Sequence, residues 1–163
     1  MKICALIVTY NRKELVYECL TAVLSQTYPV EHVVLFDNAS TDGTYEYLKN
    51  HGVFEDKRID YTYVKKNIGA AGAYSEAFKI AQNIECDWLW EMDDDTIPTP
   101  NCLKHLVDAL DILTDEKHIS FLASTVYGEN CEYMNVPLVD CRPSEECFND
   151  YRRLFLCKAL EKR

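Results

Sequence analysis

Three adjacent aspartates, Asp93, Asp94 and Asp95, are the residues best suited to chemistry in this sequence. They follow an apolar, tryptophan-rich segment, residues 86–92 (CDWLWEM), which we expect to form a buried strand. Adjacent carboxylates repel one another, so they need either a compensating cation or good solvation. On an extended chain alternate side chains point the same way, which would direct Asp93 and Asp95 at one ion and Asp94 elsewhere. Mg²⁺ or Mn²⁺ suits two carboxylates completed by water and phosphate oxygens, and a solvated acidic turn is the alternative interpretation.

Polar residues also follow two other apolar segments, residues 3–8 and 32–37. The first set comprises Thr9, Tyr10, Asn11 and Arg12, and the second comprises Asp37 and Asn38. An acid after a second strand can hold a ribose in a dinucleotide-binding fold, but that site needs a glycine-rich first turn. The first turn here reads Thr-Tyr-Asn-Arg, and the sequence contains no P-loop motif. Asp37 is therefore either a ligand contact or a turn and helix-cap residue.

Asn67, Gly69 and Gly72 open a predicted helix within the segment KKNIGAAGAYSEAF. The glycines would let a ligand approach the backbone closely, and a helix N-terminus favours an anion. Capping of the helix and its close packing on a sheet explain the same residues about as well. No nucleophile motif of the type Gly-x-Ser-x-Gly occurs, and the four histidines lie outside any recognisable motif.

The elements that must position these residues alternate between strand-like and helix-like segments. We expect strands over residues 3–8, 32–37, 58–64, 86–92 and 119–123. Helical spacing of apolar residues predicts helices between them, with side-chain caps from Asn11, from Ser40 or Thr41, and from Thr99. This alternation is typical of a mostly parallel sheet, whose ligands bind outside the carboxyl ends of the strands, where the polar residues fall. The strand over residues 58–64 alternates apolar and polar residues and should lie nearer the sheet's edge.

The composition limits the classes of protein that remain. A length of 163 residues suits one compact domain, and a hydrophobic content of 48% excludes disorder. The 27 acidic and 17 basic residues give a net charge of −10, which argues against binding to nucleic acid or to an anionic membrane surface. The N-terminal apolar run is too short for a transmembrane segment, so we expect a cytoplasmic protein.

The eight cysteines do not form a recognisable metal-binding pattern. None of the common zinc spacings, such as Cys-x-x-Cys, occurs among them. A zinc module would have to use Cys131, Cys141, Cys147 and Cys157, which are separated by 10, 6 and 10 positions. We therefore expect reduced thiols distributed through the core and the surface.

Taken in order, the polar clusters resemble a known family. VTYNR after the first strand, FDNASTDGT after the second, Asn-x-Gly-x-x-Gly at the third helix and MDDD after the fourth strand are similar to glycosyltransferase family 2. The resemblance covers about residues 1–125 and is strongest to galactofuranosyltransferase- and rhamnosyltransferase-like members. It implies the GT-A fold, a Rossmann-like three-layer α/β/α arrangement with a mostly parallel central sheet. Residues 1–125 would form its nucleotide-sugar-binding half.

The resemblance implies a role for each cluster. The nucleotide would contact Thr9, Tyr10, Asn11, Arg12, Asp37, Asn38, Asn67, Gly69, Asp93 and Asp94. Within this set, Arg12 would lie close to the diphosphate, and Asp37 would accept a hydrogen bond from the N3–H group of uracil or thymine. Asp93 and Asp95 would hold Mg²⁺ or Mn²⁺ against the diphosphate, and Asp94 would be a neighbour of lesser role.

The function that the resemblance implies is inverting, metal-dependent transfer of a sugar from a UDP- or dTDP-sugar to a glycan or lipid-linked acceptor. The general base of such enzymes is a carboxylate in the second half of the domain, and its tryptophan-glycine-aspartate-aspartate motif is not found here. We therefore identify no catalytic residue, regard residues 126–163 as an atypical tail, and expect the base and the acceptor-side half beyond Arg163. Self-association, or peripheral attachment at the inner membrane face through other regions or partners, would be compatible with such a truncated domain.

Two alternatives differ in what the chain would do with a nucleotide-sugar. A non-catalytic binding fragment would have the same pocket without a base or an acceptor platform. A sugar-phosphate nucleotidyltransferase would have a related layout, but it would need a glycine-rich, basic loop after the first strand, and none is present.

Overall fold

The computed structural model of the chain describes residues 1–112, 122–128, 130 and 133–134. It divides into two compact units, residues 1–103 and residues 104–163. The predicted boundary near residue 125 stays a prediction. The four cysteines of the zinc alternative (Cys131, Cys141, Cys147 and Cys157) lie outside the described residues.

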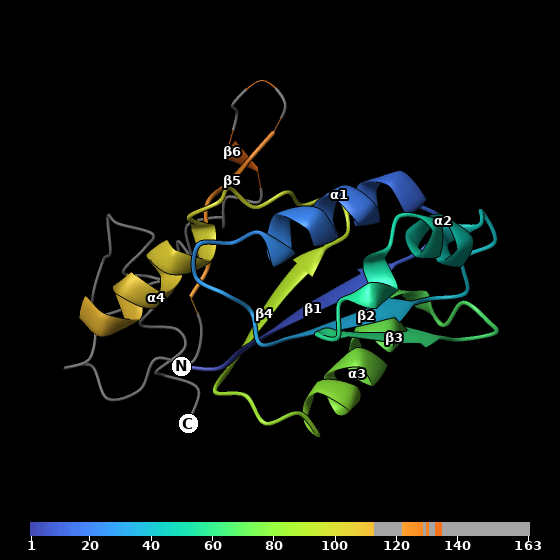
Figure 1. Cartoon of the computed structure of the whole chain (residues 1–163), viewed down its shortest axis with the longest axis horizontal. Helices are drawn as coiled ribbons and strands as arrows, with labels where there is room; N and C mark the ends of the chain where they lie inside the picture. The colour runs from blue at the N-terminus through green and yellow to red at the C-terminus, as the bar shows by residue number, and fades with distance from the viewer. Residues whose placement is uncertain (113–121, 129, 131–132, 135–163) are drawn as a thin grey trace, which may run out of the picture. The chain divides into compact units, whose positions relative to one another are not determined.

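The N-terminal unit is built on a parallel, four-stranded sheet (Figure 1). Its strands are β1 (Ile3–Thr9), β2 (His32–Asp37), β3 (Ile59–Tyr63) and β4 (Trp88–Asp93), in the order β3-β2-β1-β4. The apolar runs of β1 and β2 occupy the two central positions, where both faces are covered and continuous apolar sequence is required. The alternating strand β3 lies at the edge, as predicted.

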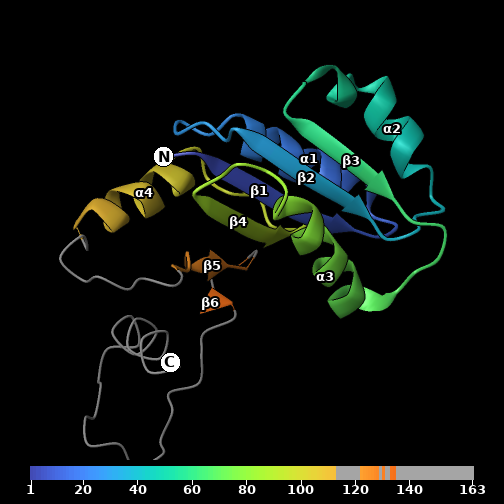
Figure 2. The ribbon, with the colours of Figure 1, turned by 90° about the horizontal axis from the view of Figure 1, so that it is seen from below.

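Helices cover both faces of this sheet, which confirms the predicted three-layer α/β/α arrangement (Figures 1 and 2). They are α1 (Lys13–Leu24), α2 (Thr44–Asn50) and α3 (Gly69–Ala81), with a short 3₁₀ helix η1 (Val53–Glu55) after α2. The views show α1 and α2 on one face and α3 on the other. A further helix, α4 (Cys102–Ile112), begins in the first unit and continues into the second. No helix in the described part of the chain is long and apolar enough to span a membrane.

The second unit contains a short antiparallel pair of strands, β5 (Val126–Tyr127) and β6 (Tyr133–Met134). The predicted strand over residues 119–123 lies mostly outside the described residues, and its last two residues, Leu122 and Ala123, are not in a strand. Three of the cysteines, Cys4, Cys19 and Cys86, are free thiols in the structure, as expected.

Three predicted helix caps are wrong, because the helices begin later than the sequence pattern indicates. Helix α1 begins at Lys13 without a side-chain cap, since Asn11 adopts a left-handed backbone conformation with φ of 55°. Helix α2 begins at Thr44 after Gly43, so neither Ser40 nor Thr41 caps it. Helix α4 begins at Cys102, and Thr99 contributes its backbone carbonyl oxygen to the preceding turn.

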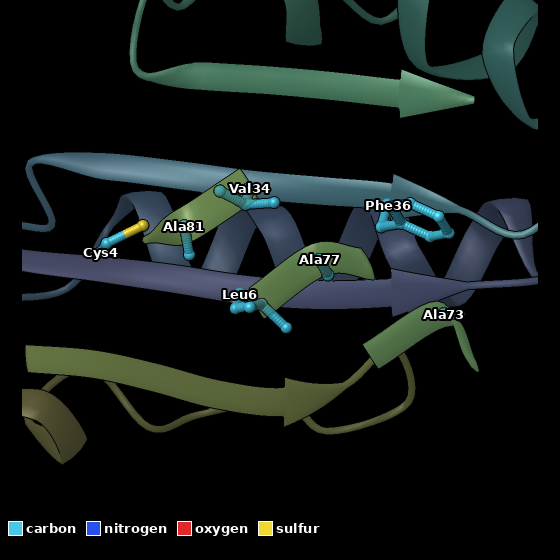
Figure 3. Close-up of a cluster of buried hydrophobic side chains, with 7 residues drawn as sticks. All are labelled: Cys4, Leu6, Val34, Phe36, Ala73, Ala77 and Ala81. Atoms are coloured by element: carbon cyan, nitrogen blue, oxygen red, sulfur yellow. The ribbon is translucent and has the colours of Figure 1, made fainter. Parts of the chain in front are cut away.

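Small side chains allow α3 to pack closely on the sheet (Figure 3). Ala73, Ala77 and Ala81 recur along one face of the helix and are fully or almost fully buried. They contact the side chains that β1 and β2 direct to this face of the sheet, namely Cys4, Leu6, Val34 and Phe36. This close packing fixes α3, and therefore the loop that precedes it, beside the carboxyl ends of the strands.

We predict that Ala77→Leu destabilises the protein, because Ala77 has no exposed surface and the added side chain cannot be accommodated without displacing α3. The free energy of unfolding, measured by urea denaturation, should fall by about 1–3 kcal/mol. The matched control is Ala71→Leu, on the exposed first turn of the same helix, which should change it by less than about 0.5 kcal/mol. Equal stability of the two variants would contradict the close packing of α3.

Candidate functional site

The carboxyl ends of three neighbouring strands bring the predicted polar residues together. Thr9, which ends β1, pairs in register with Asp37, which ends β2. On the other side of β1, Val8 pairs with Asp93, which ends β4. The Asn38 backbone N–H also donates a hydrogen bond to the Thr9 carbonyl oxygen at 2.9 Å. Residues that are far apart in the sequence therefore form one continuous polar edge.

Asp94 is the buried member of the acidic triplet, with only 4% of its surface exposed. The Thr9 hydroxyl donates to Asp94 Oδ2 at 2.7 Å, and Arg12 Nη1 donates to Asp94 Oδ1 at 3.0 Å. Burial raises the pKa of the Asp94 carboxyl above its usual value, while the bonds from Thr9 and Arg12 act in the opposite direction. This Thr9–Asp94–Arg12 network joins the end of β1 to the turn after β4.

The hydrogen bonds of the acidic triplet do not follow the alternation that the sequence suggested. Arg12 Nη1 also donates to Asp95 Oδ2 at 2.7 Å, so Asp94 and Asp95 converge on one guanidinium. Asp93 instead accepts a hydrogen bond from the Tyr74 hydroxyl of α3 at 2.7 Å. Asp93 and Asp95 are nevertheless both exposed while Asp94 is buried, so the exposure of the three side chains alternates as the sequence suggested. The strand ends at Asp93 and the chain turns at the next two residues, which lets Asp94 and Asp95 converge on Arg12. That Asp93 and Asp95 hold one ion stays a prediction.

Asp37 is almost completely buried, with 1% of its surface exposed. The Ser40 backbone N–H donates to Asp37 Oδ1 and the Tyr61 hydroxyl donates to Asp37 Oδ2, both at 2.7 Å. Because both carboxylate oxygens accept a hydrogen bond, the side chain is held in one orientation. The turn role, one of the two interpretations of Asp37, is therefore present in the structure.

Asn11 joins the loop after β1 to the loop after β2. Its backbone N–H donates to Ser40 Oγ at 2.9 Å, and its side-chain Oδ1 accepts from the Thr41 backbone N–H at 2.7 Å. Asparagine is one of the few residues that tolerates the left-handed conformation seen here. Tyr10, the neighbouring residue, exposes 44% of its surface at the same edge.

Asn38 and Asn67 connect the end of β2 to the start of α3. Asn38 Nδ2 donates to Asn67 Oδ1 at 3.2 Å, and the Ile68 backbone N–H donates to Asn38 Oδ1 at 3.0 Å. The Gly69 N–H donates to Asn67 Oδ1 at 2.8 Å, and its φ of 76° is one that favours glycine. Glycine at position 72 is favoured for a different reason, because a Cβ there would lie only 3.3 Å from the Ile68 side chain.

The site offers oxygen ligands to a cation without forming a closed metal centre. Asp93 and Asp95 are exposed, whereas Asp94 is buried. Within the residues that the structure describes, no cluster of three or more histidine, cysteine or acidic side chains could hold a metal ion. A divalent ion at this turn would therefore need ligands from phosphate or water in addition to protein carboxylates.

Sequence reasoning missed Tyr61 and Tyr74. Their hydroxyls reach Asp37 and Asp93 across sequence separations of 24 and 19 residues. Tyr61 lies on an alternating strand and Tyr74 on a helix, positions where tyrosine is common for packing alone. Only the fold reveals that each ring directs its hydroxyl at an acid that ends a strand.

The chain belongs to glycosyl transferase family 2, because residues 4–133 match the sequence model of that family. The galactofuranosyltransferase GlfT1 of Mycolicibacterium smegmatis is 31% identical over 96 residues, which are 59% of this chain and 30% of that protein. The UDP-Glc:alpha-D-GlcNAc-diphosphoundecaprenol beta-1,3-glucosyltransferase WfaP of Escherichia coli is 37% identical over 79 residues, 47% of this chain and 30% of that protein. The chain spans about a third of the length of the curated relatives it matches.

Solved structures confirm the predicted GT-A fold. The mannosyltransferase PcManGT of Pyrobaculum calidifontis, in complex with GDP-Man and Mn²⁺, has a TM-score of 0.58 and 26% identity over 67% of this chain and 32% of its own. TarS of S. aureus, in complex with UDP-GlcNAc, has a TM-score of 0.66 and 22% identity over 88% of this chain and 39% of its own. The family resemblance deduced from the ordered motifs is thereby confirmed as well.

We predict that Thr9→Val weakens the fold, because it leaves the buried Asp94 Oδ2 without its hydroxyl donor at nearly unchanged side-chain volume. The free energy of unfolding in metal-free buffer should fall by about 1–3 kcal/mol. Thr62→Val is the matched control, since Thr62 lies on β3 at the opposite edge of the sheet from β4. A loss no greater than that of the control would show that the Thr9–Asp94 bond does not stabilise this edge.

Proposed function

We propose that the chain is the nucleotide-sugar-binding part of an inverting glycosyltransferase that uses a UDP- or dTDP-sugar and a glycan or lipid-linked acceptor. The observation that carries this proposal is the position of Asp37 and the acidic turn at one polar edge, in a chain of family 2. Support for a uridine nucleotide comes from a relative, since WfaP is named for UDP-Glc.

Asp37 is the group proposed to select the base. A carboxylate can only accept hydrogen bonds, and the N3–H group of uracil or thymine is a donor, whereas N1 of adenine and N3 of cytosine are acceptors. Two donors already hold Asp37, which leaves lone pairs on both oxygens for a ligand. The burial of Asp37 supports selectivity, because an unmatched base would leave a desolvated charge without a further partner.

Asp93 and Asp95 are the groups proposed to hold Mg²⁺ or Mn²⁺. Both are exposed carboxylates on adjoining parts of one turn, and magnesium is usually bound by one or two carboxylates with substrate phosphates and water. The Mn²⁺ in the PcManGT complex supports a divalent ion in this fold. When bound, such an ion supplies positive charge that stabilises the departing nucleoside diphosphate.

The chain's own residues would bind and orient the donor. Asp37 would fix the base, the exposed ring of Tyr10 would contact the nucleoside, and Arg12 would keep the acidic turn in place through Asp94 and Asp95. The acceptor hydroxyl would attack the anomeric carbon from the face opposite the leaving group, assisted by a general base. No described residue is assigned as this base, so a non-catalytic binding fragment is the alternative function.

Titration of the 163-residue chain with UDP should give saturable binding that requires Mn²⁺, measured by isothermal titration calorimetry with and without EDTA. Asp95→Ala should weaken this binding at least about tenfold, because it removes a proposed ligand of the ion. Asp60→Ala, which alters an exposed acid on β3 at the far edge of the sheet, should leave it unchanged. An absence of Mn²⁺-dependent binding in the unaltered chain would refute the proposed site. Turnover of the donor, with and without acceptor, then distinguishes an enzyme from a binding fragment.

Asp37→Asn should weaken the binding of UDP more than that of ADP, because the ring nitrogen proposed to face the carboxylate is a donor in uracil (N3–H) and an acceptor in adenine (N1). We expect a loss of about tenfold for UDP and less than about twofold for ADP, in competition titrations with Mn²⁺ present. The substitution nearly conserves the volume of the side chain, so a folded variant is expected. An equal loss for both nucleotides would remove Asp37 from base recognition.

A further inference from the structure

The Tyr61 hydroxyl is a partly buried hydrogen-bond donor that neither the family motifs nor the proposed chemistry uses. Its ring lies on the edge strand β3, and its oxygen is 2.7 Å from Asp37 Oδ2. We propose that Tyr61 is a positioning residue that sets the base specificity of the nucleotide site by orienting Asp37. This inference rests on the proposed function, since it concerns the same nucleotide.

An aromatic cluster formed by Tyr45, Phe54 and Tyr61 holds the Tyr61 ring in place. The ring centroid of Tyr61 lies 5.1 Å from that of Phe54 and 5.5 Å from that of Tyr45, and the other two rings stack at 5.2 Å. Tyr45 belongs to α2 and Phe54 to η1, so two further elements restrain the ring. Contacts at these distances favour one ring position, which fixes where the hydroxyl points.

The hydroxyl remains a donor at neutral pH. Burial raises the pKa of Tyr61 well above its usual value, and the hydrogen bond to Asp37 adds to this shift. The Ser40 N–H holds the other carboxylate oxygen of Asp37. With both oxygens held, the lone pairs that remain on Asp37 point in fixed directions, and a base must match them to bind.

Loss of the hydroxyl should therefore reduce discrimination between bases more than it reduces nucleotide affinity in general. Without it, Asp37 Oδ2 lacks its partner, and the carboxylate can rotate or recruit water. Uracil would then lose its oriented acceptor, while cytosine, whose N3 is itself an acceptor, would lose little. A purely structural role for Tyr61 would weaken UDP and CDP binding alike and leave their ratio unchanged.

The test compares UDP and CDP binding to the full chain and its variants with Mn²⁺ present. Tyr61→Phe should lower the ratio of UDP to CDP affinity by about five- to tenfold, because a bond to a charged acceptor is lost. Tyr45→Phe removes a hydroxyl from the same aromatic cluster and should leave the ratio unchanged. Thermal denaturation of each variant, recorded alongside, establishes that it is folded at the temperature of the titration.

A double-mutant cycle shows whether Tyr61 acts through Asp37. If it does, Asp37→Asn combined with Tyr61→Phe should discriminate no worse than Asp37→Asn alone. An unchanged ratio in Tyr61→Phe, with a lowered ratio in Asp37→Asn, would overturn the role of Tyr61 and leave the proposed function intact. Failure of the unaltered chain to bind UDP at all would instead refute the proposed function. Additive losses in the double variant would show that Tyr61 contributes independently of Asp37, which also contradicts the inference.

Discussion

The polar edge depends on one constraint, which is that the buried carboxylate of Asp94 needs hydrogen-bond donors. Asp94 itself is buried, and an unpaired carboxylate at a buried position would be costly. Thr9 and Arg12 provide the compensating bonds, one from the last residue of β1 and the other from the loop that follows. Arg12 also bonds to Asp95, so the same network fixes the exposed part of the acidic turn.

Hydroxyl groups orient the other acids in the same way. The Tyr61 hydroxyl donates to Asp37 and the Tyr74 hydroxyl donates to Asp93, each with an oxygen–oxygen distance of 2.7 Å. Asp94 accepts a similar bond from the Thr9 hydroxyl. In each case the donor belongs to a different element from the acid. Burial raises the pKa of both tyrosines, which keeps them protonated at neutral pH. Acids held in this manner are oriented before any ligand arrives, so less entropy is lost when a ligand binds. The two tyrosines extend the site to β3 and α3.

The sequence was sufficient to locate the four strands of the N-terminal sheet, and insufficient for the contacts within the site. The expectation that the segment over residues 86–92 is a buried strand was wrong, because β4 lies at an edge of this sheet and most of its residues are half-buried or exposed. Apolar runs identified β1 and β2 because only buried central strands need such runs, and alternation placed β3 at the edge. The cap at Asn11 failed because its side chain bonds to the neighbouring loop, a tertiary contact that competes with local capping. The family resemblance implied a lesser role for Asp94, and its bonds to Thr9 and Arg12 are tertiary contacts that the sequence does not show. Long-range hydroxyl bonds, such as that of Tyr61, leave no periodic signal in the sequence.

The charge at the polar edge bears on how an acidic protein could hold a diphosphate. Arg12 provides positive charge there, but its guanidinium already pairs with both Asp94 and Asp95. Two acids against one base leave this group net negative, and Asp93 adds a further exposed carboxylate beside it. A diphosphate brought to the same turn would be repelled, since like charges within a few ångströms interact unfavourably even in partly solvated surroundings. In the proposed function, a divalent cation between the two sets of oxygens would remove this repulsion, and the carboxylates that repel the diphosphate would be the groups that retain the ion.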